Sequence, residues 1–250
     1  MILEIKNYLV SNVAFVKSYY KKYRIYKKRR EFKGLSNQEI FTKIYESNKW
    51  DTNGLANDIY YSGTGSYGDV AQKYIDFVSQ FIKEKNIASI TDIGCGDFEI
   101  GNQITQKNNK VNYIGCDVVE GLIKRNTNKF QSKTISFQHL DASKDELPKA
   151  ELITIRQVLQ HLSNNDIKII LSKVAHYKYA LISEHLLKEG LEKSINKDKP
   201  TGPDTRMVDG SGVYINLSPY SIKCIEVLRC RDDAFNKEAY IVTYLVEGNE

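Results

Sequence analysis

Residues 89–97 have the sequence Ser-Ile-Thr-Asp-Ile-Gly-Cys-Gly-Asp, and this stretch decides the fold. Its first five residues are mostly apolar and predict a buried strand, while residues 98–107 behind it predict a helix. Between them, Gly94 and Gly96 predict a tight turn, because glycine adopts positive φ and lets backbone N–H groups approach a ligand. This order of strand, glycine turn and helix predicts a ligand site at the carboxyl end of the strand.

A second acidic strand end indicates which ligand is bound. The next apolar run, residues 111–116, stops at Asp117, 21 residues beyond Gly96, where a carboxylate accepts both hydroxyls of a ribose. The dinucleotide fingerprint is incomplete, because Asp97 replaces its third glycine and an acidic side chain disfavours a pyrophosphate. A cationic adenosine ligand without phosphate fits better, and S-adenosylmethionine is such a molecule. We expect Asp92, Asp97 and Asp117 to face its ammonium, sulfonium or ribose.

Residues 89–162 resemble the class I S-adenosylmethionine-dependent methyltransferases in four motifs. These are the glycine turn at 92–96, the acid Asp117, the Asp141-Ala142 pair and residues 151–162. One such feature alone is commonly an ordinary turn or a helix cap, whereas four in the family's order are specific. The chain departs from the family at Asp97, where many members have glycine. The resemblance implies S-adenosylmethionine as cofactor, bound by Ser62, Gly63, Ser66, Asp92, Gly94, Cys95, Gly96, Asp117, Val118, Asp141, Ala142 and Arg156.

Apolar runs alternate with helical segments along the rest of the chain, which indicates an α/β fold. We expect strands near 89–93, 111–116, 134–139, 150–156, 179–184, 222–229 and 239–246, and helices near 69–85, 98–107, 119–128 and 164–176. This order predicts a Rossmann-like, seven-stranded, mainly parallel sheet with a C-terminal antiparallel hairpin strand and an N-terminal helical extension. We expect residues 1–68 to form a basic helical extension and lid, and residues 69–250 a methyltransferase domain with a substrate-binding insertion at 186–219.

The composition favours an enzyme of the cytoplasm, peripheral at most to the inner face of the membrane. The 250 residues suffice for one α/β domain plus an extension, and no apolar stretch approaches the about 20 residues that span a bilayer. The N-terminus also lacks the pattern of a secretory signal. Cys95, Cys116, Cys224 and Cys230 have no paired ligand spacing, so we expect free thiols and no metal site.

Residues 1–33 differ in composition from the rest of the chain. Nine Lys or Arg residues and four tyrosines lie between Lys17 and Lys33, and apolar residues recur before them at steps of three and four. This pattern predicts an amphipathic helix over residues 2–28. The first interpretation is a solvated helix packed on the domain. Docking to an anionic membrane surface or to an acidic partner such as a glycosyltransferase comes second, and nucleic-acid binding is last.

The stretch before the first strand holds the single tryptophan, Trp50, and the loop Ser62-Gly-Thr-Gly-Ser66. An ordinary polar loop explains this cluster as well as a functional lid does. The same features resemble a subset of bacterial methyltransferases associated with surface-polysaccharide gene clusters. By that resemblance Ser62, Gly63 and Ser66 close over the methionine end of the cofactor. The resemblance also implies O-methylation of a cell-surface carbohydrate or of its phosphorylated or nucleotide-linked precursor.

Methyl transfer to a hydroxyl needs the acceptor aligned with the methyl group and benefits from a base beside it. Glu184 and His185 end the fifth predicted strand, where open α/β sheets bind ligands. We therefore expect His185 to accept the proton, and Glu184 to orient it or to bind a sugar hydroxyl. His161, after the fourth strand, is a further candidate base, although simple packing against the sheet explains it slightly better.

The insertion at 186–219 is where we place the acceptor, because long loops in compact domains are commonly functional. Asn196, Asp198 and Arg206 resemble the corresponding stretch of the polysaccharide-cluster subset. The guanidinium of Arg206 is suited to a phosphate or carboxylate of the acceptor, with a surface ion pair as the competing explanation.

Other functions stay open at this stage. Residues 156–159 lack the Asn/Asp-Pro-Pro-aromatic tetrad of some amine methyltransferases, which disfavours a base or exocyclic amine as acceptor. A small-molecule or RNA methyltransferase is one alternative. The other is a non-catalytic scaffold that recruits a glycosyltransferase or a membrane through residues 1–33, against which the intact Asp92, Gly94, Gly96 and Asp117 argue.

Overall fold

The structure is a computed structural model that describes residues 19–20, 23, 25–27, 29–51, 60–232 and 238–248. The chain divides into two compact units, residues 1–36 and residues 37–250. In the first unit the described residues between 19 and 30 are helical, and residues 31–34 form a turn. The amphipathic helix predicted over residues 2–28 lies for the most part outside the described residues.

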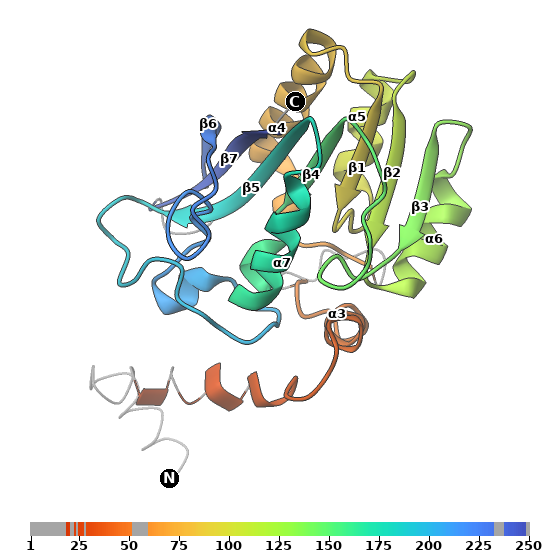
Figure 1. Cartoon of the computed structure of the whole chain (residues 1–250). Coiled ribbons are helices and arrows are strands. Elements are labelled where there is room, and N and C mark those ends of the chain that lie inside the picture. The colour runs from red at the N-terminus through yellow and green to blue at the C-terminus, as the bar shows by residue number, and fades with distance from the viewer. Residues whose placement is uncertain are drawn as a thin grey trace. The chain divides into compact units, whose positions relative to one another are not determined.

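The second unit is built on one seven-stranded sheet with the strand order β3-β2-β1-β4-β5-β7-β6 (Figure 1). Its strands are β1 (Ser89–Ile93), β2 (Asn112–Asp117), β3 (Ile135–His139), β4 (Leu152–Arg156), β5 (Tyr179–Leu187), β6 (Ile225–Arg231) and β7 (Ala239–Glu247). Strands β1 to β5 run parallel, whereas β7 is antiparallel to β5 and β6 is antiparallel to β7. The prediction of a mainly parallel, Rossmann-like sheet with an antiparallel C-terminal hairpin is confirmed.

Helices cover both faces of this sheet. These helices are α4 (Gly68–Glu84), α5 (Glu99–Lys107), α6 (Glu120–Phe130) and α7 (Asn164–Val174), with short 3-10 turns at Thr64–Ser66, Leu159–His161 and Arg206–Asp209. Helix α3 (Asn37–Glu46) lies beyond the ends of the strands (Figure 1). Figure 1 shows α7 in front of β4 and β5 and α4 behind the sheet. The apolar side chains of β4 are buried, as expected for a parallel strand that is covered from both sides.

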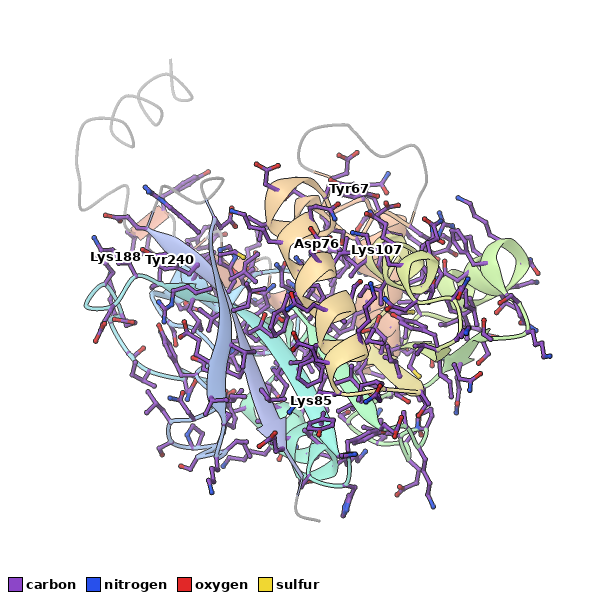
Figure 2. The ribbon with its side chains drawn as sticks, turned by 90° about the horizontal axis from the view of Figure 1, so that it is seen from above. Tyr67, Asp76, Lys85, Lys107, Lys188 and Tyr240 are labelled. Atoms are coloured by element: carbon purple, nitrogen blue, oxygen red, sulfur yellow. The ribbon has the colours of Figure 1, made fainter. Side chains whose placement is uncertain are left out.

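The hydrophobic core behind the sheet is centred on α4. Tyr74, Ile75 and Val78 lie on one face of this helix and pack in a cluster with Ile90 of β1 and Leu152 of β4. The solvent side of the same helix is polar. There Asp76 forms an ion pair with Lys107 of the neighbouring α5 (Figure 2).

The ends of the strands lie within three residues of their predicted positions, and the difference at the end of β5 shortens the insertion at its start. Strand β5 continues to Leu187, so the first two residues assigned to the insertion belong to the sheet. The connection to β6 then comprises residues 188–224 and contains the 3-10 turn Arg206–Asp209. The four cysteines carry free thiols. Among the described residues, no helix combines the length and the apolar character needed to cross a membrane.

Candidate active site

The glycine turn after β1 has the geometry that its sequence predicts. Gly94 and Gly96 have φ angles of 73° and 55°, in the left-handed region that side chains disfavour. The backbone N–H groups of Gly94 and Cys95 donate to the carbonyl of Cys116 at 2.8 and 3.0 Å, which ties the turn to the end of β2. A Cβ atom at Gly94 would lie 2.3 Å from Cγ2 of Val158, so the segment after β4 packs directly on the turn.

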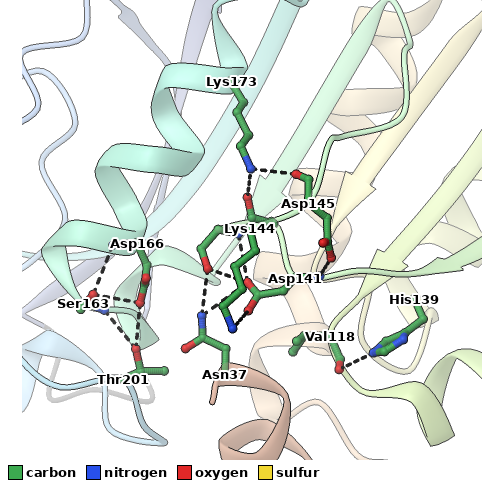
Figure 3. Close-up of polar contacts among 12 residues, drawn as sticks. Asn37, Val118, His139, Asp141, Lys144, Asp145, Ser163, Asp166, Lys173 and Thr201 are labelled. Carbon is green, nitrogen blue, oxygen red and sulfur yellow. Dashed lines mark hydrogen bonds and ion pairs between the residues drawn. The ribbon is translucent and has the colours of Figure 1, made fainter. Parts of the chain in front are cut away.

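The predicted ribose acid lies beside this turn. The carboxylate of Asp117 accepts hydrogen bonds from the backbone N–H of Gly96 at 3.2 Å and of Val119 at 3.1 Å. Burial raises the pKa of Asp117 to about 6, although these N–H groups act in the opposite direction. The carbonyl of the adjacent Val118 lies 3.0 Å from Nε2 of His139 at the end of β3 (Figure 3). The structure thus brings together the turn and the acid, which are separate motifs in the sequence.

Asp92 is held inside the sheet below the turn. Its two carboxylate oxygens accept hydrogen bonds from the hydroxyl groups of Thr154, at 2.6 Å, and Tyr113, at 2.5 Å. Burial raises its pKa, with the two hydroxyl groups opposing that shift. These contacts connect β1 to both of its neighbours, and a contact of Asp92 with the cofactor stays a prediction.

Residues 60–67, here called the lid loop, lie on the glycine turn. The backbone N–H of Ser62 donates to Oδ2 of Asp97 at 3.1 Å, and the N–H of Asp97 donates back to Oγ of Ser62 at 2.7 Å. The Tyr67 hydroxyl donates to the same Asp97 oxygen at 3.3 Å. Asp97, which departs from the family pattern, is therefore the residue that attaches the loop. Gly63, with φ of 92°, and Ser66 complete the turn of the loop, and the N–H of Ser66 donates to the carbonyl of Gly63.

Arg156 attaches the same loop to the end of β4. Its Nη2 donates to the carbonyl of Gly65 at 2.7 Å, and its guanidinium lies 5.0 Å from the ring centre of Tyr74. Burial lowers the pKa of Arg156. A Cβ atom at Gly65 would lie 2.4 Å from Oε1 of Gln157, so the loop also packs closely on Gln157, the residue after Arg156. What the structure shows for Arg156 is a contact with the lid loop, and its predicted contact with the cofactor is not tested.

The Asp141-Ala142 pair lies at the β3 side of the site. Oδ1 of Asp141 accepts hydrogen bonds from the N–H and the hydroxyl of Ser143, at 3.0 and 2.6 Å, and from the amide of Asn37 at 3.4 Å (Figure 3). Nζ of Lys173 on α7 donates to the carbonyl of Ala142 at 2.8 Å. Helices α3 and α7 thus hold this segment in place beside Val118 and the ribose acid.

Glu184 and His185 are neighbours in β5, and their side chains have different partners, so an orienting contact from Glu184 to His185 stays a prediction. Neighbouring residues of a strand point to opposite faces of the sheet. The carboxylate of Glu184 accepts the backbone N–H groups of Leu159 and Gln160 at 2.8 and 3.1 Å. Burial raises the pKa of Glu184 to about 8. Nε2 of His185 instead lies 3.0 Å from Oδ2 of Asp232, a residue that the sequence analysis did not single out.

His161 ends the 3-10 turn after β4, and its ring is nine-tenths buried. Its ring centre lies 5.3 Å from that of Trp50 and 6.5 Å from that of Phe41. Burial, together with the nearby charge of Lys199, lowers the pKa of His161 to about 3, so the imidazole is uncharged near neutral pH. Within the described part of the chain, Nδ1 of this ring is a buried atom without a hydrogen-bond partner.

An aromatic cluster, which the sequence analysis did not assign as a site, lies over the carboxyl ends of the central strands. It consists of Phe41, Tyr45, Trp50, Tyr60 and His161. The Tyr45 hydroxyl lies 3.2 Å from Oγ of Ser62, and a Cβ atom at Gly96 would lie 3.6 Å from the same hydroxyl. The spacing of Phe41 and Tyr45 on one helical face was visible in the sequence, but their position over the glycine turn was not.

Arg206 lies inside the protein. Its side chain has only 1% of its surface exposed, and its guanidinium donates to the carbonyls of Lys197 and, at 2.7 Å, Leu162. These bonds join the insertion to the segment after β4. The competing explanation of a surface ion pair is wrong because of this burial, and acceptor binding by Arg206 stays a prediction.

Asn196 and Asp198 also hold the insertion together. The amide of Asn196 donates to the carbonyls of Tyr214 and Ser218, both at 2.9 Å. Oδ1 of Asp198 accepts the backbone N–H of Asn164, the first residue of α7, at 2.8 Å. Contacts with an acceptor are not tested for either residue. No group of three His, Cys, Asp or Glu side chains suited to a metal occurs among the described residues.

The fold and the site are similar to those of class I methyltransferases. Residues 91–177 match the family described as methyltransferase domain. The glycine turn, Asp117 and the Asp141-Ala142 pair all lie within this match, and S-adenosylmethionine is the methyl donor of such domains. No curated protein matches the chain in sequence.

Solved structures share this fold at low sequence identity. The N-methyltransferase NodS from Bradyrhizobium japonicum WM9, bound to S-adenosylhomocysteine, matches with a TM-score of 0.55 and 12% identity, covering 82% of this chain and 98% of that chain. Human N-acetylserotonin methyltransferase with S-adenosylmethionine matches with a TM-score of 0.52 and 14% identity, covering 96% and 69%. Magnesium protoporphyrin IX methyltransferase from Synechocystis PCC 6803 matches with 0.51 and 14%, covering 86% and 99%. At these identities the likeness shows the fold.

The residues at the site fit S-adenosylmethionine. Asp117 supplies a carboxylate at the end of β2, and the two glycines leave the turn beside it without side chains. The charge is also suitable, because Asp117 and Asp97 both raise the pKa of the buried Tyr45 hydroxyl, in addition to burial. Two carboxylates thus create a negative potential where a cationic ligand is expected.

Proposed function

We propose that the protein transfers the methyl group of S-adenosylmethionine to an oxygen atom of a carbohydrate or of its phosphorylated or nucleotide-linked precursor. The observation that carries the donor half is the contact between the glycine turn and Asp117, through the 3.2 Å bond from Gly96. The acceptor half is supported by the resemblance of the Ser62–Ser66 loop to the polysaccharide-cluster subset. It is also supported by the sequence Arg156-Gln157-Val158-Leu159, which replaces the tetrad of amine methyltransferases.

The chain's own residues divide the work of such a reaction. Bound S-adenosylmethionine supplies an electrophilic methyl group on a sulfonium. Asp117 accepts the ribose hydroxyls, and the lid loop, attached through Asp97 and Arg156, shields the turn from water. A hydroxyl acceptor must also lose its proton, which requires a base.

We propose His185 as this base, with Asp232 in the orienting role first given to Glu184. The carboxylate of Asp232, whose Oδ2 lies 3.0 Å from Nε2 of His185, would orient the neutral ring for this task. His161 is less suited to the task, because an imidazole with a pKa of about 3 is a weak base. If this is correct, His185→Gln lowers turnover while the affinity for the cofactor stays unchanged, and an equally active variant removes His185 from the reaction.

The experiment that tests the function has two stages. Calorimetric titration of the purified protein with S-adenosylmethionine and S-adenosylhomocysteine comes first, and we expect both to bind. Transfer of a radiolabelled methyl group to nucleotide sugars and extracted glycans comes second. Asp117→Ala should abolish binding, while the matched variant Asp76→Ala, which removes an exposed carboxylate on α4, should not. If the wild-type protein bound neither compound, the methyltransferase hypothesis would be refuted and the alternative of a non-catalytic scaffold would be favoured.

Residues 1–33 are proposed as a docking segment for an anionic membrane surface. Tyr19, Tyr23 and Tyr26 are among the most exposed large side chains of the described residues, and the guanidinium of Arg30 lies 5.8 Å from the ring centre of Tyr26. Tyrosines beside basic residues suit a lipid headgroup layer. Co-sedimentation with vesicles containing anionic lipid, and none with neutral vesicles, is the expected result. Binding to neither type of vesicle would contradict the proposal, and steeply salt-dependent binding to RNA alone would favour the RNA alternative.

A further inference from the structure

The strand order determines where the reactive end of a bound cofactor lies. In the order β2-β1-β4 the topology reverses between β1 and β4, and ligands of open α/β sheets lie across the carboxyl ends of the strands at that point. A cofactor whose ribose is bound by Asp117 at the end of β2 therefore extends across the glycine turn toward the segment after β4. Its sulfur and methyl group come to the side where the Leu159–His161 turn lies.

The rings of Tyr45, Trp50 and His161 from the aromatic cluster lie beside this turn. The ring centre of Trp50 lies 5.0 Å from that of Tyr45 and 5.3 Å from that of His161. The indole N–H donates to the carbonyl of Pro203 at 3.3 Å, and Cβ of Trp50 would meet a Cβ at Gly63 at 3.8 Å. The indole is thus held between the insertion and the lid loop, and it is only partly buried.

The electrostatic surroundings of these rings suit a cation. Burial, together with Lys199, lowers the pKa of His161 to about 3, so its ring is uncharged and does not repel a cation. The Tyr45 hydroxyl interacts with the charges of Asp117 and Asp97. The ammonium group of Lys199 is engaged by the backbone of the same turn, because its Nζ donates to the His161 carbonyl at 3.1 Å. Aromatic faces attract cations through their quadrupole, and more strongly where water is excluded.

We propose that Tyr45, Trp50 and His161 bind the sulfonium of S-adenosylmethionine through their ring faces, with Trp50 as the main contact. This inference rests on the proposed function and adds a role for Tyr45 and Trp50, which lie outside the four family motifs. It makes the site selective for the positively charged donor over the neutral product. When the methyl group passes to the acceptor oxygen, the sulfur keeps the bonding electron pair and becomes an uncharged thioether, and the acceptor's proton passes to the base. The rings then lose their cationic partner, and release of S-adenosylhomocysteine is favoured.

The test compares the affinities for S-adenosylmethionine and S-adenosylhomocysteine, measured by calorimetry on the full chain. For Trp50→Leu we expect the ratio of the two affinities to shift against S-adenosylmethionine by about 2- to 30-fold, which corresponds to a cation–π energy of about 0.5–2 kcal/mol. Trp50→Phe should keep most of the ratio, because it keeps an aromatic face. Trp50 is the single tryptophan of the chain, so its fluorescence in the wild-type protein should also respond to the two compounds.

Phe77→Leu is the matched control, because Phe77 packs beside Phe81 in the core cluster behind the sheet. It should leave the ratio unchanged. Equal weakening of both compounds in Trp50→Leu would indicate a purely structural role and overturn the inference, as would an unchanged ratio. If the wild-type protein binds neither compound, the proposed function itself fails, which is a different result from a lost preference.

Discussion

A methyl group added at Gly96 should separate the lid loop from the glycine turn. The Cβ atom of Gly96→Ala would lie 2.3 Å from Oγ of Ser62, far inside the contact distance of the two atoms. That hydroxyl accepts the N–H of Asp97 at 2.7 Å and has to move away from it. The new side chain must also adopt the φ of 55° that glycine has at this position.

The expected cost has two parts. The left-handed conformation costs alanine about 1 kcal/mol relative to glycine. The Asp97 N–H, left without its acceptor, costs about 1–2 kcal/mol more. Gly96→Ala should therefore lower the free energy of unfolding by about 2–3 kcal/mol. Ser62→Ala should lose the same hydrogen bond and cost about 1–2 kcal/mol by itself.

The double variant tests the reasoning. In the Ser62→Ala background the hydrogen bond is already absent, so Gly96→Ala adds only the backbone strain and a 3.1 Å contact with Cβ of residue 62. The loss of unfolding free energy in the double variant should then be smaller than the sum of the two single losses by about 1 kcal/mol or more. A double-mutant cycle by urea unfolding measures this difference. Costs that add within about 0.3 kcal/mol would show that the residues act independently and would refute the contact.

Three further predictions concern other parts of the site and core. Burial raises the pKa of Asp117 to about 6, so the affinity for S-adenosylmethionine should fall as the pH drops below about 6 and the carboxylate is protonated. Binding by Asp117→Asn, measured by calorimetry, should lack this pH dependence. The raised pKa acts on stability in the opposite direction, because it favours the folded state at low pH and this contribution is lost as the pH rises through 6. Phe98 is fully buried at the start of α5, and Phe98→Ala should lower the free energy of unfolding by about 3–5 kcal/mol in urea. Arg206→Lys cannot reach the carbonyls of Lys197 and Leu162 together, so it should cost about 1.5–3 kcal/mol and speed limited proteolysis of residues 188–224, whereas unchanged proteolysis would contradict this structural role.

The surroundings of the candidate base His185 depend partly on local strand geometry and partly on the pairing of distant strands. Adjacent positions in a strand point to opposite faces, and Glu184 and His185 are adjacent in β5, which continues to Leu187, beyond the predicted end at 184. The partner that His185 has, Asp232, is not predictable in this way. It comes from the end of β6, and only the pairing of β5, β7 and β6 brings the two side chains together.

The sequence by itself determined the order of strands and helices, the class of the fold and the glycine turn with its acidic partner. Periodicity, glycine positions and the spacing from Gly96 to Asp117 are local or short-range signals, and they are written in the chain directly. The tertiary structure alone decided that Ser62 lies on Asp97, that Trp50 lies beside His161, and that the guanidinium of Arg206 is buried. Ser62 and Asp97 are 35 positions apart, and Arg206 is 44 positions from Leu162, whose carbonyl it binds. Such contacts form only when the whole sheet and its covering loops pack together.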